Sequence, residues 1–162
     1  MAIPHPEQTF RYLNKLPVLL VLIISLTGQS CNRNKKIFKS DCDVDKSFKR
    51  IGFKQLIDSL ANYDQKYVEV SGKYEEDKEL SALINDSLGT RRLNRNALGV
   101  NFSQDCPLYL SGTRTGLFEY NDGQFTQIND KSVTLRGKID LHNKGHLRQY
   151  KATIERVSYI KL

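Results

Sequence analysis

Two stretches of the chain alternate apolar and polar residues with a period of two, which is typical of a β-strand with one buried face. They cover residues 67–74 and 133–141, and their apolar positions are Val68, Val70, Tyr74, Val133, Leu135, Ile139 and Leu141. Each stretch also places a glycine, Gly72 or Gly137, on its apolar face. Glycine inside a strand marks a sharp bend or a bulge. Two such strands predict a small and strongly curved sheet.

Further elements follow from the same kind of pattern. Residues 52–63 have a helical spacing of apolar positions, which predicts an amphipathic helix before the first strand. These positions are Phe53, Leu56, Ile57, Leu60 and Tyr63. Shorter strands are predicted over residues 79–84 and 97–102, and a hairpin with a tight turn over residues 117–128. In the last strand, over residues 147–162, the alternation shifts by one residue, which predicts a bulge near positions 155 and 156.

The first thirty residues have a different character. Arg11 and Lys15 precede an apolar run over residues 16–26, and small polar residues follow it. A membrane-spanning helix takes about 20 apolar residues, so the run is too short to be one. A basic start, a short apolar run and small residues predict a secretory signal segment over residues 1–30.

The segment that follows the apolar run is Thr27-Gly28-Gln29-Ser30-Cys31. It resembles the lipobox of bacterial lipoproteins, with Gly28 at the position where leucine is usual. The resemblance implies that Cys31 is diacylated, becomes the N-terminus and holds the protein to a membrane, with each buried methylene contributing about 0.8 kcal/mol. Residues 31–45 are then a lipidated polar tether. An ordinary secreted protein and an uncleaved anchor remain the alternatives.

The cysteine count agrees with export. The chain has three cysteines, and once Cys31 carries lipid, Cys42 and Cys106 remain. An even pair in an oxidising compartment predicts a disulfide between them. Two buried free thiols are the alternative.

The predicted elements together resemble a known architecture. The resemblance rests on the helix before the first strand, on the two motifs that contain Gly72 and Gly137, and on the Gly145-His146 turn before the last strand. The chain resembles an OB-fold, the small five-stranded Greek-key barrel, as found in small bacterial exported proteins. This implies a mainly β domain over residues 46–162 with one N-terminal amphipathic helix, and it assigns no catalytic residues.

Composition adds little to this interpretation. With 39% apolar and 27% charged residues, the chain is typical of one globular domain with appendages. A formal charge of +7 favours anionic surfaces in general but selects no particular one.

The residue types used in catalysis and metal binding are sparse. His142 and His146 have H-x3-H spacing, but Asn143-Lys144-Gly145 between them predicts a turn rather than a helical metal site. We therefore predict no metal and no cofactor, and a structural hydrogen bond for His146. Glu75, Glu76, Asp77 and Glu79 form an acidic cluster that is expected in the turn after the first predicted strand over residues 67–74, and no nucleophile motif is present. We predict no enzyme activity; the alternative is a hydrolase that uses Glu79 with His146.

The sequence therefore predicts a lipid-anchored periplasmic module of the bacterial cell envelope that binds or scaffolds an envelope protein or a glycan. The contact surface is expected on the barrel face and on the loop that carries Arg91, Arg92 and Arg95. A single-stranded nucleic-acid binder with a basic groove and stacking aromatics is the other alternative. Because an exported lipoprotein meets little nucleic acid, we expect no such partner.

Overall fold

The structure is a computed structural model that describes residues 35–78, 80–85, 96–121 and 123–162. These residues lie in one compact unit, Lys35–Leu162, which is mainly β with little helix. The elements run in the order β1 (Ile37–Lys39), β2 (Lys49–Arg50), α3 (Phe53–Asp58), the 3-10 helix η1 (Leu60–Tyr63), β3 (Tyr67–Asp77), β4 (Leu80–Ile84), β5 (Leu98–Val100), β6 (Tyr109–Leu110), β7 (Tyr120–Asn121), β8 (Gln124–Phe125), β9 (Ser132–Asp140), the 3-10 helix η3 (His146–Arg148) and β10 (Thr153–Lys161).

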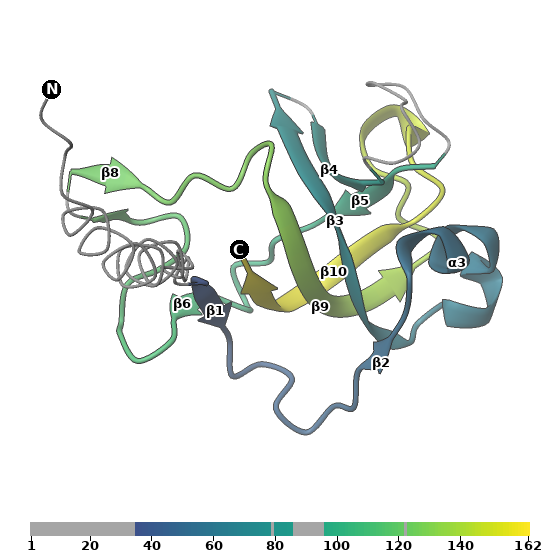
Figure 1. Cartoon of the computed structure of the whole chain (residues 1–162). Coiled ribbons are helices and arrows are strands. Elements are labelled where there is room, and N and C mark those ends of the chain that lie inside the picture. Colours follow the sequence, from purple (N-terminus) through teal and green to yellow (C-terminus); the bar gives the residue numbers. More distant parts are fainter. Residues whose placement is uncertain (1–34, 79, 86–95, 122) are drawn as a thin grey trace, which may run out of the picture. The chain divides into compact units, whose positions relative to one another are not determined.

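Five strands close into a barrel (Figure 1). Around the ring the order is β3, β4, β5, β10, β9 and back to β3. All of these pairs are antiparallel except β5 with β10, which is parallel. The shorter strands β2, β1 and β6 extend the sheet beyond the ring, and β7 and β8 pair separately. Closure leaves the five strands without free edges, which removes the aggregation risk of an open sheet.

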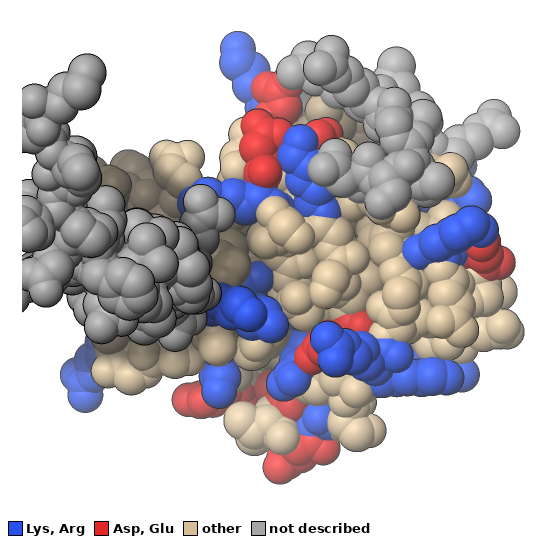
Figure 2. Space-filling model, viewed as in Figure 1, with Lys and Arg blue, Asp and Glu red and all other residues tan. Residues whose placement is uncertain are grey.

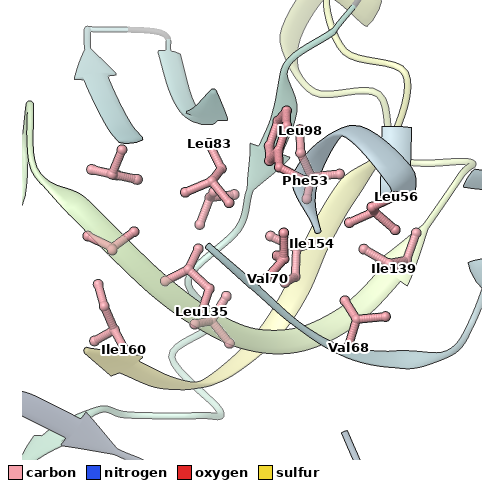
Figure 3. Close-up of a cluster of buried hydrophobic side chains, with 14 of the residues drawn as sticks. Phe53, Leu56, Val68, Val70, Leu83, Leu98, Leu135, Ile139, Ile154 and Ile160 are labelled. Atoms are coloured by element: carbon pink, nitrogen blue, oxygen red, sulfur yellow. The ribbon is translucent and has the colours of Figure 1, made fainter. Parts of the chain in front are cut away.

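The interior of the barrel is filled by the alternating apolar residues that the sequence predicts. Val68 and Val70 from β3 and Leu135 and Ile139 from β9 are at most 1% exposed, and Ile154 of β10 meets them (Figure 3). At one end the Tyr74 hydroxyl lies 3.0 Å from the Ser81 hydroxyl, which donates to the carbonyl of Val100 at 2.8 Å. Burial raises the pKa of Tyr74 to about 12, with the Ser81 contact acting in the opposite direction.

The strongly curved sheet that the two glycines predict is confirmed, since its strands close into a barrel. A Cβ built on Gly72 would lie 2.7 Å from the Ile84 carbonyl oxygen, and one on Gly137 would lie 2.7 Å from the Glu155 carbonyl oxygen. Both glycines therefore allow neighbouring strands to approach more closely than any side chain permits. The predicted bulge is also confirmed, since the register between β9 and β10 shifts between Glu155 and Tyr159, and Arg156 has φ +49°.

The helical segment is shorter than the twelve positions of the sequence pattern. The α-helix α3 spans Phe53–Asp58 and stops at Ser59, whose hydroxyl donates to the Gln55 carbonyl at 2.6 Å; η1 then continues the segment to Tyr63. A serine that bonds back to the preceding turn competes with the helical backbone, which accounts for the break. Phe53, Leu56 and Ile57 are buried against the barrel.

The segment predicted to be a polar tether contains a strand. In β1, Ile37–Lys39 pairs with β10 and with β6, and Phe38 is only 1% exposed. The Leu162 amide also donates to the Lys36 carbonyl at 2.9 Å. The folded unit therefore begins at residue 35 rather than at residue 46, because Phe38 has a buried site that its polar neighbours in the sequence do not suggest.

Residues 101–131, between β5 and β9, form an insert beside the barrel. The predicted hairpin is present but short, with Tyr120 opposite Phe125 and Asn121 opposite Gln124. Leu108, Leu117 and Ile128 attach the insert to the main core. The predicted disulfide is confirmed: Cys42 and Cys106 are bonded, with Cα atoms 5.4 Å apart and a sequence separation of 64.

Candidate functional site

Most of the predicted site residues lie outside the described part of the chain. These are Cys31, Glu79, Arg91, Arg92 and Arg95, so the structure tests neither the lipidation site nor the arginine loop nor the Glu79–His146 pair. His146 itself is described and lies exposed in η3, in the loop between β9 and β10.

A polar depression lies where the arginine loop begins. It has a volume of about 940 Å³ and lies between α3, η1 and the outward face of β3. Its lining residues are mostly hydroxyl, amide and charged groups: Gly52, Phe53, Lys54, Gln55, Asp58, Ser59, Asn62, Tyr63, Ser71 and Asn85. Asn85 directly precedes residues 86–95, so the loop with the three arginines starts at the border of this depression. We call it the α3–β3 depression.

A charged cluster borders the α3–β3 depression. Glu69 on β3 accepts from Arg136 of β9 at 2.7 Å and pairs with Arg50 of β2 at 3.3 Å. A smaller depression of about 330 Å³ is lined by Arg50 and Glu69 and shares Phe53, Gln55 and Ser71 with the larger one. Two guanidinium groups around one carboxylate leave a net positive charge at this edge.

Aromatic rings hold one of these guanidinium groups in place. The Arg136 guanidinium carbon lies 4.5 Å from the Tyr159 ring centre and 5.7 Å from the Phe48 ring centre. Phe48 in turn meets Tyr67 edge-on, with ring centres 5.6 Å apart. These two ring contacts and the bond to Glu69 fix the position of the Arg136 guanidinium. Figure 2 shows that positive and negative side chains adjoin each other at several places on the face in view.

Other titratable groups stabilise turns through hydrogen bonds to the backbone. The Asp64 carboxylate accepts from the Leu141 amide at 3.0 Å, and the Asp140 carboxylate accepts from the His142 amide at 2.8 Å. These two carboxylates and His142 are close enough to hold a cation. The His142 side chain is 85% exposed, and the backbone bonds already account for the cluster as a turn.

The acidic residues predicted to form a turn lie inside β3 instead, because Glu75, Glu76 and Asp77 continue its pairing with β4. They also have a basic partner. Lys73 lies 3.0 Å from Asp130 and 3.5 Å from Glu75, and the hydrogen bond with Asp130 is the main reason why the pKa of Lys73 is raised. These residues line a depression of about 490 Å³ together with Glu76 and Asp77. Lysine neutralises part of this acidic surface, so this end of β3 carries an ion-pair cluster rather than a bare group of carboxylates.

The outward face of β4 and β5 is covered by the chain itself. Tyr150, from the loop before β10, is 8% exposed and packs on Ala82 and Ala97. A Cβ built on Gly99 or Gly145 would lie 2.6 Å or 2.5 Å from its ring, so the ring fits between two positions that carry no side chain. Burial raises the pKa of the Tyr150 hydroxyl. Sequence reasoning placed Tyr150 on the alternating stripe of a strand and missed this cover.

Sequence reasoning also missed an ion pair next to the disulfide. Asp43 follows Cys42, its side chain is 1% exposed, and it accepts from the Arg156 guanidinium at 3.1 Å. Arg156 also donates to the Cys42 carbonyl at 3.4 Å, and the bond to Asp43 raises the pKa of Arg156. The bulge in β10 thus aims Arg156 at the turn that carries the disulfide. The irregular alternation near residue 156 indicated the bulge, but it did not indicate that Asp43 is the partner of Arg156.

Comparison of the chain with protein-family models, with curated proteins and with solved structures gives no match. Among the described residues, no helix combines the length and the apolar character needed to cross a membrane.

Proposed function

We propose that this chain is the precursor of a bacterial lipoprotein whose barrel, held to a membrane through Cys31, binds or scaffolds an envelope protein or a glycan in the periplasm. In this proposal the domain has no chemistry of its own. The α3–β3 depression and the adjoining loop with Arg91, Arg92 and Arg95 form its contact surface.

Two features support export and anchoring. The first 31 residues carry a basic start, a short apolar run and a lipobox-like end at Cys31. The disulfide between Cys42 and Cys106 is the bond expected of a protein that folds in an oxidising compartment.

The strand order supports an OB-like assignment of the barrel. Numbered along the chain, the five strands pair in the order first, second, third, fifth, fourth and back to the first, with the third and fifth parallel. A Greek-key OB barrel has this order, and the two bent strands with Gly72 and Gly137 stand at its first and fourth positions.

The observation that carries the binding proposal is the α3–β3 depression. It joins amide and hydroxyl groups of Gln55, Asn62 and Ser71 to the cluster of Glu69 with two arginines. Amides, hydroxyls and planar charged groups recognise the hydroxyls of a glycan or the backbone and side chains of a peptide. The arginine loop starts at Asn85, on the border of this surface.

Nucleic-acid binding has less support. OB barrels bind oligonucleotides on the face of the second and third strands, which here are β4 and β5. Tyr150 covers that face over Ala82 and Gly99, and within the described residues the face offers small or aliphatic side chains rather than stacking rings.

A mass measurement tests the anchor. Native protein extracted from membranes should begin at Cys31, carry acyl groups and gain about two daltons when its disulfide is reduced. A full-length or unacylated mass would contradict the lipoprotein part of the proposal.

A co-purification experiment tests the binding surface. The triple change R91S, R92S and R95S, and separately Q55A with N62A, should abolish recovery of the partner that cross-links to the wild-type protein in cells. A control that removes the same charge elsewhere, K144S, R148S and K151S, should leave recovery unchanged. Equal recovery of the partner with all three variants would show that neither the α3–β3 depression nor the arginine loop binds it.

A further inference from the structure

The exposed aromatic residues of the described chain all belong to the insert over residues 101–131. Tyr109, Phe118, Tyr120 and Phe125 are 42%, 56%, 65% and 55% exposed, whereas the remaining described Phe and Tyr side chains are buried or half-buried. We call these four residues the insert aromatic patch. Single exposed apolar side chains are ordinary, but a group of large ones on one segment marks a contact surface.

The patch is held in place by ring contacts. Tyr120 and Phe125 meet edge-on across β7 and β8, with ring centres 5.1 Å apart. Phe118 lies 5.1 Å from Phe102, which lies 5.9 Å from Tyr74 in the barrel wall. These contacts hold the exposed rings in fixed positions. A partner that binds them therefore does not have to pay the entropy of ordering these side chains.

The chain enters the folded unit beside this insert. β1 pairs with β6 of the insert, with Phe38 opposite Leu110 and Lys39 opposite Tyr109, and the Ser111 amide donates to the Ile37 carbonyl at 2.8 Å. Figure 1 shows β1, β6 and β8 on the same side of the barrel, away from α3. Residues that precede Lys35 therefore leave the domain at its insert side.

We propose that the insert aromatic patch is a membrane-docking surface that lies in the headgroup region of the bilayer in which Cys31 is anchored. This inference rests on the proposed lipid anchor. Cys31 is four residues before Lys35, and four residues span at most about 14 Å. The anchor therefore holds the insert side of the domain close to the bilayer, where Tyr and Phe rings with apolar bodies partition favourably.

Charge at the same edge suits anionic headgroups. Lys35, Lys36 and Lys39 are exposed at the start of the unit, and Lys39 lines a depression of about 750 Å³ together with Tyr109 and Arg114. Asp41 and Glu119 line it too, but the Glu119 carboxylate already accepts from the Gly116 amide at 2.8 Å. Basic residues next to a bilayer strengthen its attraction for a protein that carries one lipid anchor.

A second copy of the chain fits this surface less well. In a two-fold contact the same patch meets itself, so Lys35, Lys36 and Lys39 of both copies would all add positive charge to one interface. Their repulsion disfavours that contact, whereas an anionic bilayer attracts the same residues.

The absence of tryptophan from the sequence allows a direct test. Mature acylated protein that begins at Cys31 and carries F118W or F125W is reconstituted in vesicles of phosphatidylethanolamine and phosphatidylglycerol that contain brominated phosphatidylcholine. We expect a blue-shifted emission that the bromine quenches, as for a ring about 5–10 Å inside the boundary. The matched control is L147W, in the loop between β9 and β10, where residue 147 is 83% exposed; it should show neither effect.

The outcomes separate docking from anchoring. Acylated protein that floats with the vesicles while the tryptophans at 118 and 125 behave like the control would overturn the docking surface and leave the anchor intact. A blue shift without quenching, together with a dimeric mass, would assign the patch to a second copy and also overturn it. Protein without acyl groups would overturn the anchor and, with it, the docking geometry.

Discussion

At the scale of single residues, the barrel depends on positions where the usual rule for that residue type is broken. Gly72 and Gly137 stand inside strands, where glycine is normally unfavourable, because a neighbouring backbone oxygen occupies the place of their side chain. Arg156 adopts a positive φ because the bulge turns its guanidinium toward Asp43. Each exception has a contact that accounts for it.

The glycine contact gives the first prediction. G137A should lower the free energy of unfolding by about 1–3 kcal/mol, because the new methyl group meets the Glu155 carbonyl oxygen, which is backbone and cannot move aside. Urea unfolding measures the change. G52A is the control, since a Cβ at Gly52 meets nothing within 4 Å. Equal effects of the two changes would contradict the close strand crossing.

The buried tyrosine gives a pH dependence. Tyr74 has a pKa of about 12 in the folded protein and about 10 in the unfolded chain, so between these values the unfolded chain releases its proton first. Stability should therefore fall as the pH rises from 10 to 12, by about 1.4 kcal/mol per pH unit from this group. Tyr150, whose pKa is also raised, acts in the same direction.

The Y74F variant isolates this effect. At neutral pH it should be less stable by about 1 kcal/mol, because Ser81 loses its hydroxyl partner. Its stability should then decline less steeply than that of the wild type above pH 10. Parallel declines in the two proteins would show that Tyr74 titrates normally.

At the scale of elements, the structure separates what local pattern can predict from what it cannot. β3 and β9 could be predicted from the alternation of apolar and polar residues, because each strand is long enough to place several apolar residues on the same buried face. β1 could not be predicted, since Ile37 and Phe38 stand alone among polar residues and their partners in β10 are far away in sequence. The same holds for the candidate site. The number of cysteines was enough to predict the pair Cys42 and Cys106, whereas the roles of Tyr150 and Asp43 depend on contacts with residues far away in sequence.

The role of β1 can be measured. F38A should destabilise the protein by about 3–5 kcal/mol, because the ring is 1% exposed and joins the main core. The comparison is F125A, which removes the same ring from a site that is 55% exposed and should change stability by less than about 0.5 kcal/mol. Thermal unfolding of both variants distinguishes a structural strand from a dispensable tether.

At the scale of the whole molecule, the disulfide joins two regions that lie outside the five-stranded ring. Cys42 lies between β1 and β2, and Cys106 lies in the insert. The bond and the Asp43–Arg156 pair therefore link the start of the domain, the insert and the bulge of β10. A rigid connection of this kind would keep the insert in a fixed orientation relative to the start of the folded unit.

Removal of the disulfide tests that connection. The double variant C42A and C106A should be less stable by about 2–4 kcal/mol, because its unfolded chain is no longer cross-linked. Trypsin should then cleave the insert at Arg114 faster than it cleaves the barrel. Unchanged cleavage at Arg114 would mean that Leu117 and its apolar contacts alone hold the insert.

β10 completes the ring because it pairs with the strands on both of its sides. It is the common partner of β1, β5 and β9, whereas β3 pairs with β4 and with β9 independently of it. Without β10 the ring is open between β5 and β9, and each of these two strands keeps an unpaired edge. An unpaired edge can pair with another chain, so a folding chain whose β10 is not yet in place is exposed to aggregation at β5 and β9.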